Sequence, residues 1–165
     1  MGLFERIASN VMLMVRRPPR QQYGALCHRI GPEGKLEIML VTSRETGRWV
    51  IPKGWPMGDK PSHEVAAQEA YEEAGVRGRV QQQPLGHFNY QKRLRNGLEV
   101  DTRVQVYTLE VSALEDDFPE CKERNRVFLR PREAAELVKE PGLKRMIRSF
   151  GNLAPEEPTI TRRDL

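Results

Sequence analysis

The segment at residues 62–75, SHEVAAQEAYEEAG, is the part of the sequence that most restricts the fold. Ser62 is a favourable N-cap residue, and Glu64 places negative charge in the first turn, where the helix dipole favours it. The four alanines of the segment are strong helix formers. Gly75 is typical of the position that follows a helix end. The segment therefore predicts a helix that begins after Ser62 and stops at Gly75.

Three glutamates lie on one face of this predicted helix. Glu69, Glu72 and Glu73 are related as i, i+3 and i+4. Like charges at this spacing repel by roughly a few tenths of a kcal/mol per pair, which solvent tolerates, so a solvated face is one interpretation. A Mg²⁺ site is the other, because this ion prefers carboxylate oxygens and substrate phosphates. The glycine- and proline-rich loop at 52–61 favours the second interpretation, since it lets backbone approach a ligand.

Strand patterns precede and follow the helix. We expect strands at 23–30, 36–42, 49–51, 85–90, 102–111 and 127–129, and further helices at 131–139 and 141–150. The nearly continuous apolar run LEIMLVT at 36–42 is typical of a central strand. Asn96 and Gly97 predict a hairpin tip. The order of elements indicates an α/β or α+β sandwich with a mixed sheet.

The two ends of the chain differ from this domain, which we expect at residues 20–150. Residues 1–19 have apolar positions at approximate helical spacing and end in two prolines, so they predict a helical arm that docks or supports a homodimer. Residues 151–165 carry prolines and charges and predict a flexible tail. No apolar run approaches the ~20 residues of a membrane span. Two cysteines are too few for a disulfide framework, which favours a reducing, cytoplasmic location.

The run from Gly54 to Val76 resembles the Nudix box, Gly-x5-Glu-x7-Arg-Glu-U-x-Glu-Glu-x-Gly-U, where U is a bulky aliphatic residue. Both glycines, the three glutamates and the final aliphatic residue match. Three positions depart from the pattern: Lys60 replaces the first glutamate, Gln68 the arginine and Ala70 an aliphatic residue. The resemblance implies a Nudix-type α/β/α sandwich and a hydrolase that cuts a phosphoanhydride bond with Mg²⁺ or Mn²⁺.

The resemblance also implies roles for the matching residues. Glu69, Glu72 and Glu73 would be catalytic and, with the carbonyl of Gly54, would bind the metal. The general base would be Glu72 or Glu73, with a carboxylate of the loop at 115–123 as the alternative. The arginine of the box normally helps to hold a glutamate, so its replacement affects orientation and rate more than the identity of the activity.

The flanking residues are most similar to the diphosphoinositol polyphosphate and diadenosine polyphosphate hydrolases. In that branch a serine and a basic residue follow a strand, as Ser43 and Arg44 do here, and they would contact phosphates. Further basic residues would select a polyphosphorylated ligand, since arginine binds phosphate bidentately. These candidates are Arg20, Lys53, Lys92, Arg93, Arg95 and Arg103. A solvated surface position is the alternative interpretation for each arginine.

Charge and composition restrict the partner. The formal charge of +4 favours small anionic phosphorylated substrates. Extended nucleic acid is disfavoured, because aromatic residues make up only 7% of the chain and the basic stretch is short. A nucleoside diphosphate derivative or a capped RNA end is the alternative substrate. A ligand-binding regulator with weak catalysis is the alternative function, although closely spaced carboxylates that repel one another argue for metal-dependent turnover.

Overall fold

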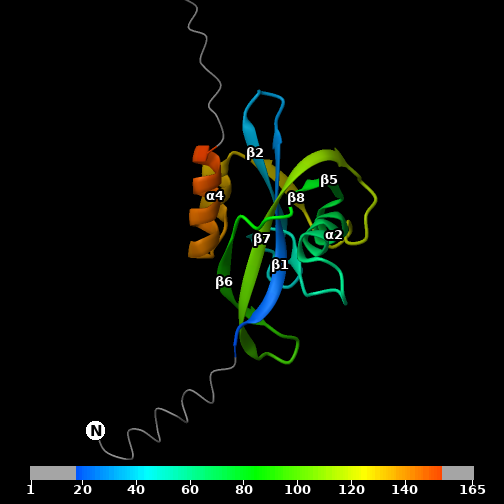
Figure 1. Cartoon of the computed structure of the whole chain (residues 1–165), viewed down its shortest axis with the longest axis vertical. Helices are drawn as coiled ribbons and strands as arrows, with labels where there is room; N and C mark the ends of the chain where they lie inside the picture. Colours follow the sequence, from blue (N-terminus) through cyan, green and yellow to red (C-terminus); the bar gives the residue numbers. More distant parts are fainter. Residues whose placement is uncertain (1–17, 154–165) are drawn as a thin grey trace, which may run out of the picture.

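A mixed sheet with helices on both faces forms the described part of the protein (Figure 1). The computed structural model describes residues 18–153. Residues 1–17 of the helical arm predicted at 1–19, and the tail from 154 onward, lie outside the described residues. The strands are β1 (Arg20–Ile30), β2 (Leu36–Thr42), β3 (Trp49–Val50), β4 (Lys53–Gly54), β5 (Val76–Val80), β6 (Gly86–Arg93), β7 (Glu99–Leu114) and β8 (Arg126–Leu129). The helices are α2 (Ser62–Ala74), α3 (Pro131–Leu137) and α4 (Pro141–Leu153).

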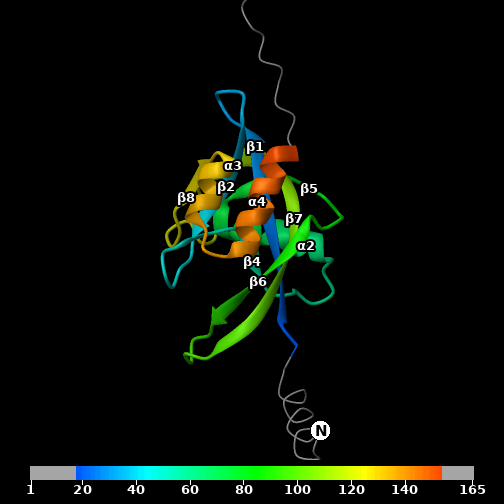
Figure 2. The same ribbon diagram turned by 90° about the vertical axis from the view of Figure 1, so that its left-hand side faces the viewer.

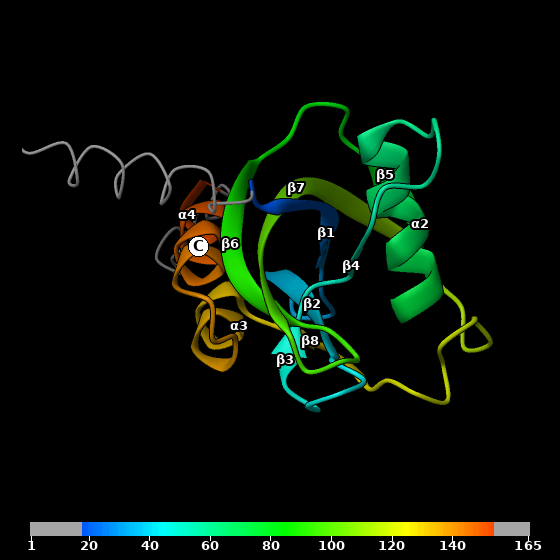
Figure 3. The same ribbon diagram turned by 90° about the horizontal axis from the view of Figure 1, so that it is seen from below.

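The sheet is mixed because its central pair of strands is parallel. The main strand order is β3-β2-β1-β7-β5, with β4 paired to β1, β6 to β7 and β8 to β2. Strands β1 and β7 run parallel, and the other pairs are antiparallel. Helices α3 and α4 lie together over one face of the sheet (Figure 2). Helix α2 lies on the opposite side (Figure 3), so the predicted α/β/α sandwich is confirmed.

The apolar run predicted as a central strand is confirmed as β2, which is buried on both faces. Ile38 and Leu40 belong to the core formed with α3 and α4. Met39 and Val41 belong to the core formed with α2. A strand covered on both faces needs apolar residues at every position, and this explains why the run is continuous rather than alternating.

Three predicted helix boundaries are wrong, one of them because α3 ends at Leu137 and not at residue 139. Pro61 rather than Ser62 is the N-cap of α2, because the Pro61 carbonyl accepts the first-turn N–H groups of Glu64 and Val65 at 3.0 Å, and no side chain caps the helix. Helix α4 continues to Leu153, so the tail does not begin at 151. Gly151 permits this, since a Cβ there would lie 2.6 Å from Cβ of Pro131. The helix end at Gly75 is confirmed.

The strand β5 was not predicted from its sequence, VRGRV. Its three central residues are exposed, and its register against β7 shifts between Arg77 and Gly78, so it shows neither an apolar run nor a clear alternation. The hairpin between β6 and β7 is confirmed, with Gly97 at a φ of +81° near its tip. Within residues 18–153, no helix is long and apolar enough to cross a membrane.

The two cysteines are expected to differ in reactivity. Cys27 is fully buried against α2, and burial raises the pKa of its thiol to about 12, with a smaller contribution from the charge of Glu73. Since only the thiolate is alkylated, Cys27 should remain unreactive at pH values of about 8. Intact-mass measurement after iodoacetamide treatment should show one label on the folded chain, at the partly exposed Cys121, and two labels in urea. Rapid double labelling of the folded chain would contradict this burial.

Candidate active site

Helix α2 carries the three predicted catalytic glutamates and packs closely on the sheet. Ala66, Ala70 and Ala74 are fully buried in the core between α2 and the sheet. Ala70, where the Nudix box has a larger aliphatic residue, therefore faces the core. The small side chains allow the helix to approach the strands. With the alanines facing the sheet, the helical register determines where the three glutamates lie.

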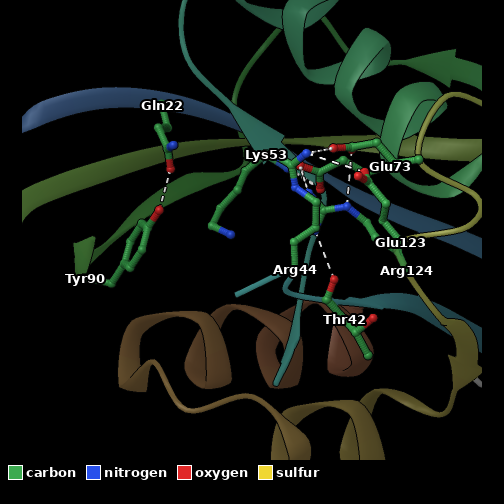
Figure 4. Close-up of polar contacts among 9 residues, drawn as sticks. Gln22, Thr42, Arg44, Lys53, Glu73, Tyr90, Glu123 and Arg124 are labelled. Atoms are coloured by element: carbon green, nitrogen blue, oxygen red, sulfur yellow. Dashed lines mark hydrogen bonds and ion pairs between the residues drawn. The ribbon is translucent and has the colours of Figure 1, made fainter. Parts of the chain in front are cut away.

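Glu73 is the most buried of the three glutamates, and both of its oxygens have partners. Its Oε1 accepts a hydrogen bond from Nη2 of Arg124 at 3.1 Å, and its Oε2 accepts one from the backbone N–H of Lys53 at 3.3 Å (Figure 4). Burial raises the pKa of Glu73 to about 7, although the positive charges of Lys53 and Arg124 act in the opposite direction. A carboxylate with a pKa near neutrality can exchange a proton at physiological pH.

The loop between β7 and β8 brings a fourth carboxylate, Glu120, to α2. The backbone N–H of Glu120 donates to the carbonyl of Glu72 at 3.0 Å. The Glu120 carboxylate pairs with Nε of Arg124 at 3.2 Å and with Nη1 of Arg44 at 3.0 Å. Of the acidic residues in the loop at 115–123, Glu120 is thus the one tied both to α2 and to Arg124. From the sequence, this loop is predicted only as the source of an alternative general base.

Glu69 lies where both burial and neighbouring carboxylates disfavour its charged form. Burial and then the charges of Glu73, Glu72 and Glu120 raise the pKa of Glu69 to about 8. Within residues 18–153, no hydrogen bond or ion pair reaches its carboxylate, although Glu72 and Glu73 have such partners. The carboxylate lies against the backbone of Gly54, where an added Cβ would overlap it. The structure thus brings the predicted ligands Gly54 and Glu69 together.

These residues match a hard divalent cation in donor type. Mg²⁺ is bound by carboxylate and carbonyl oxygens, and repulsion among the carboxylates around Glu69 would be relieved by a cation. In the described part of the chain, however, no three Asp, Glu, His or Cys side chains are gathered into a ready ligand group. The donors therefore fit the ion chemically, and their carboxylates would have to draw together to bind it.

The two polar departures from the Nudix box contact each other. Nζ of Lys60 donates to Oε1 of Gln68, and Nε2 of Gln68 donates to Oε1 of Glu72 at 2.8 Å. Gln68 therefore reaches only Glu72 among the three glutamates. The Lys60 ammonium is thus linked to Glu72 through the neutral amide of Gln68, and it does not pair directly with that carboxylate.

The predicted basic substrate residues do not form one cluster. Along β6, Phe88, Tyr90 and Lys92 alternate with residues on the other face, and Phe88 packs in the core under α3 and α4. Arg93 therefore points to the opposite face from Lys92. Arg103 lies on the Arg93 face as well, because it pairs across the hairpin with Asn89, and its Nη2 lies 3.3 Å from Nδ1 of His87.

A second set of polar residues shares the face of Lys92. Strand register places Arg20, Gln22 and Gly24 of β1 on this face, and Gly24 pairs with Lys53. The Lys53 side chain is directed toward Tyr90 (Figure 4), with its Nζ 5.4 Å from the ring centroid. The Tyr90 hydroxyl donates to Oε1 of Gln22 at 2.6 Å. Burial lowers the pKa of Lys53 to about 8; the charge of Glu73 opposes this shift and that of Lys92 adds to it.

Ser43 and Arg44 lie in the turn after β2, as predicted. The turn is closed by hydrogen bonds from Ser43 N–H to the Arg48 carbonyl and from Gly47 N–H to the Ser43 carbonyl, both 2.8 Å. Arg44 is half exposed and pairs with Glu120 and Glu123. A phosphate would therefore have to compete with these carboxylates for its guanidinium.

Sequence reasoning did not single out Arg124, Gln22 or Tyr90 as site residues. Arg124 precedes a short strand and Gln22 lies near the start of another, where polar residues are ordinary. The one available signal was period-two alternation along β6, which places Tyr90 with Lys92 and could have separated Lys92 from Arg93.

Comparison with known proteins agrees with this arrangement. No protein-family model matches the chain. The chain is 31% identical over 126 residues to Nudix hydrolase 12, mitochondrial, of Arabidopsis thaliana, a match that covers 74% of this chain and 62% of that relative. The crystal structure of a C. elegans Ap4A hydrolase superposes with a TM-score of 0.61 at 16% identity, covering 82% of this chain and 98% of that one. Over about three quarters of its length, the chain is thus similar to a Nudix hydrolase.

A further Nudix relative is the diphosphoinositol polyphosphate phosphohydrolase 2 of Rattus norvegicus. It is 33% identical over 100 residues, which cover 60% of this chain and 50% of that protein. The chain thus spans 62% and 50% of the lengths of these two relatives. The predicted resemblance to Nudix hydrolases is confirmed by the sequence matches, and the likeness to the Ap4A hydrolase shows the shared fold.

Proposed function

We propose that this chain is a Nudix hydrolase that cuts a phosphoanhydride bond in a small anionic substrate and depends on Mg²⁺, with Mn²⁺ as the alternative ion. The observation that carries the proposal is the arrangement around Glu69. Burial and then three further carboxylates raise its pKa, no cation pairs with it among the described residues, and the backbone of Gly54 lies against it. Such a site favours a divalent ion and a phosphate over a neutral ligand.

The residues of the site would have two roles, metal binding and proton acceptance. Glu69, Glu72, Glu73 and the Gly54 carbonyl would hold the ion, which neutralises phosphate charge and lowers the pKa of a bound water. One glutamate would take the proton of the attacking water. Burial raises the pKa of Glu73 to about 7, but both its oxygens have partners. Within residues 18–153, Glu72 has a partner only on Oε1, and Glu120 is the loop alternative.

The favoured substrate is a diadenosine polyphosphate or a diphosphoinositol polyphosphate. Support comes from the resemblance around Ser43 and Arg44, and from the shared face of Arg20, Lys53 and Lys92. The names of the matching proteins, a diphosphoinositol polyphosphate phosphohydrolase and an Ap4A hydrolase, point in the same direction. Arg93 and Arg103 would act from the other face of the hairpin, and they remain weaker candidates.

Turnover on a substrate panel tests this proposal. Phosphate and pyrophosphate release would be measured with Mg²⁺ or Mn²⁺ on diadenosine polyphosphates, a diphosphoinositol polyphosphate, ADP-ribose, a capped RNA end and nucleoside triphosphates. Metal-dependent release from the first two, reduced in Glu72→Gln, is the expected result. Release from another member would retain the chemistry and reject the substrate. Tight binding without turnover would favour a regulator, a function consistent with the absence of a ready ligand group among residues 18–153.

The location of the protein and the size of its partner are proposed from its thiols and its basic residues. We expect a cytoplasmic protein that acts on small molecules, since the two thiols are free and the basic residues are divided between two faces. Homodimer formation through residues 1–19 remains a prediction, because residues 1–17 lie outside the described part of the chain.

A further inference from the structure

We infer that Arg124 is the positioning residue of this site and supplies, from the loop before β8, the guanidinium that the Nudix box lacks at Gln68. The inference rests on the proposed function, because the carboxylates that Arg124 holds are those proposed to bind the ion and activate water. Arg124 itself contacts no reacting atom in this scheme. It would act by fixing Glu73 and Glu120.

The contacts of Arg124 tie three separate segments together. Its Nη2 donates to Glu73 of α2 at 3.1 Å, its Nε to Glu120 of the β7–β8 loop at 3.2 Å, and its Nη1 to the carbonyl of Thr42 at the end of β2 at 2.9 Å. The side chains of Arg124 and Glu73 are each only 8% exposed. A planar guanidinium with five donors in a rigid fork suits three acceptors in fixed directions, whereas a single ammonium does not.

Nothing else in the described chain can replace this contact. Gln68, at the arginine position of the box, donates to Glu72 and is neutral. Lys53 reaches Glu73 only through its backbone N–H, and its ammonium lies toward Tyr90. Arg44 pairs with Glu120 but lies on an exposed turn, and it has no contact with Glu73 among residues 18–153. Without Arg124, the buried Glu73 and the neighbouring Glu120 would repel each other with no shared cation between them.

Arg124→Gln and Arg124→Lys test the inference, with Arg29→Gln as the matched control. Arg29 also pairs with a glutamate, Glu37, and lies over an aromatic ring, Phe128, but it touches no site residue. For each variant we would measure kcat and KM on the substrate that the wild type cleaves. Binding of Mn²⁺ alone would be measured by isothermal titration calorimetry, and folding by circular dichroism.

Arg124→Gln should lower kcat and Mn²⁺ affinity each by about 10- to 100-fold, as is typical when the partner of a metal ligand is removed. KM should change by less than about threefold, since no substrate contact is lost. Arg124→Lys should recover only part of this loss, because one ammonium cannot reach three acceptors. Arg29→Gln should match the wild type in both measurements.

Wild-type kcat and Mn²⁺ affinity in Arg124→Gln, with only a lower melting temperature, would show a purely structural arginine and overturn the inference. If the glutamine variant does not fold, Arg124→Lys decides: wild-type values overturn the inference, and a fall of about tenfold in both supports it. If the wild type turns over no substrate, the proposed function fails. Mn²⁺ affinity then still decides the role of Arg124, because it needs no turnover.

Discussion

Glu73→Gln is expected to reduce turnover by about 10²-fold or more, because the amide can neither accept the proton of an attacking water nor bring negative charge to a bound ion. The isosteric amide keeps one acceptor oxygen, which can retain either the bond from Arg124 or the bond from the N–H of Lys53, so the fold should survive with a modest loss of stability. The measurement is kcat in saturating Mg²⁺ on the substrate that the wild type cleaves. A melting curve should confirm that the variant is folded.

Two further variants make this result specific. Glu64→Gln removes an exposed carboxylate from the first turn of the same helix and should leave kcat unchanged. Glu120→Gln tests the loop alternative for the base, so a larger loss there than in Glu73→Gln would transfer the proton-accepting role to Glu120. An unchanged rate in Glu73→Gln would remove this residue from the mechanism.

The helix and its glutamates could be predicted because their signals are local. Alanine content, first-turn charge and Gly75 define α2 within a few residues, and helical geometry alone places Glu69, Glu72 and Glu73 on one face. The burial of β2 on both faces also has a local signal, the continuous apolar run of its own sequence. The N-cap was misassigned because a favourable serine follows a proline whose carbonyl takes the capping position instead.

The rest of the site depends on contacts between distant segments. Arg124 meets Glu73 across 51 positions, and Tyr90 meets Gln22 across 68. No periodicity or composition marks such partners, since they are defined by the sheet order and by the path of the β7–β8 loop. The grouping of Lys92 with Arg93 is a different error, because adjacency in sequence places neighbours in a strand on opposite faces.

The departures from the Nudix box are understood better from these contacts than from the motif alone. Position 68 no longer needs a charge if Arg124 holds Glu73 from another segment, and Lys60 occupies the free end of the Gln68 amide. We therefore expect the site to keep its glutamates in place by a route that the motif does not contain. Activity would then depend on the β7–β8 loop, which is anchored to α2 at Gly75.

Gly75→Ala is expected to destabilise the protein by roughly 3 kcal/mol, from two causes that add. At a φ of +65°, alanine costs about 1–2 kcal/mol. Its Cβ would also meet the carbonyl of Glu115, with Cδ1 of Phe118 at 2.6 Å and Nη1 of Arg126 at 2.8 Å, and overpacking costs about 1–3 kcal/mol. The measurement is the free energy of unfolding in urea.

Gly97→Ala separates these two causes, because Gly97 has a φ of +81° but nothing lies within 4 Å of an added Cβ. This variant should lose only about 1–2 kcal/mol, the backbone contribution. Equal losses in the two variants would show that the loop moves aside without cost. A larger loss for Gly75→Ala would show that the loop is held firmly at this point, where the N–H of Glu115 donates to the Gly75 carbonyl at 2.8 Å. Since the same loop carries Glu120 and Arg124, that rigidity would be what keeps both residues against Glu73.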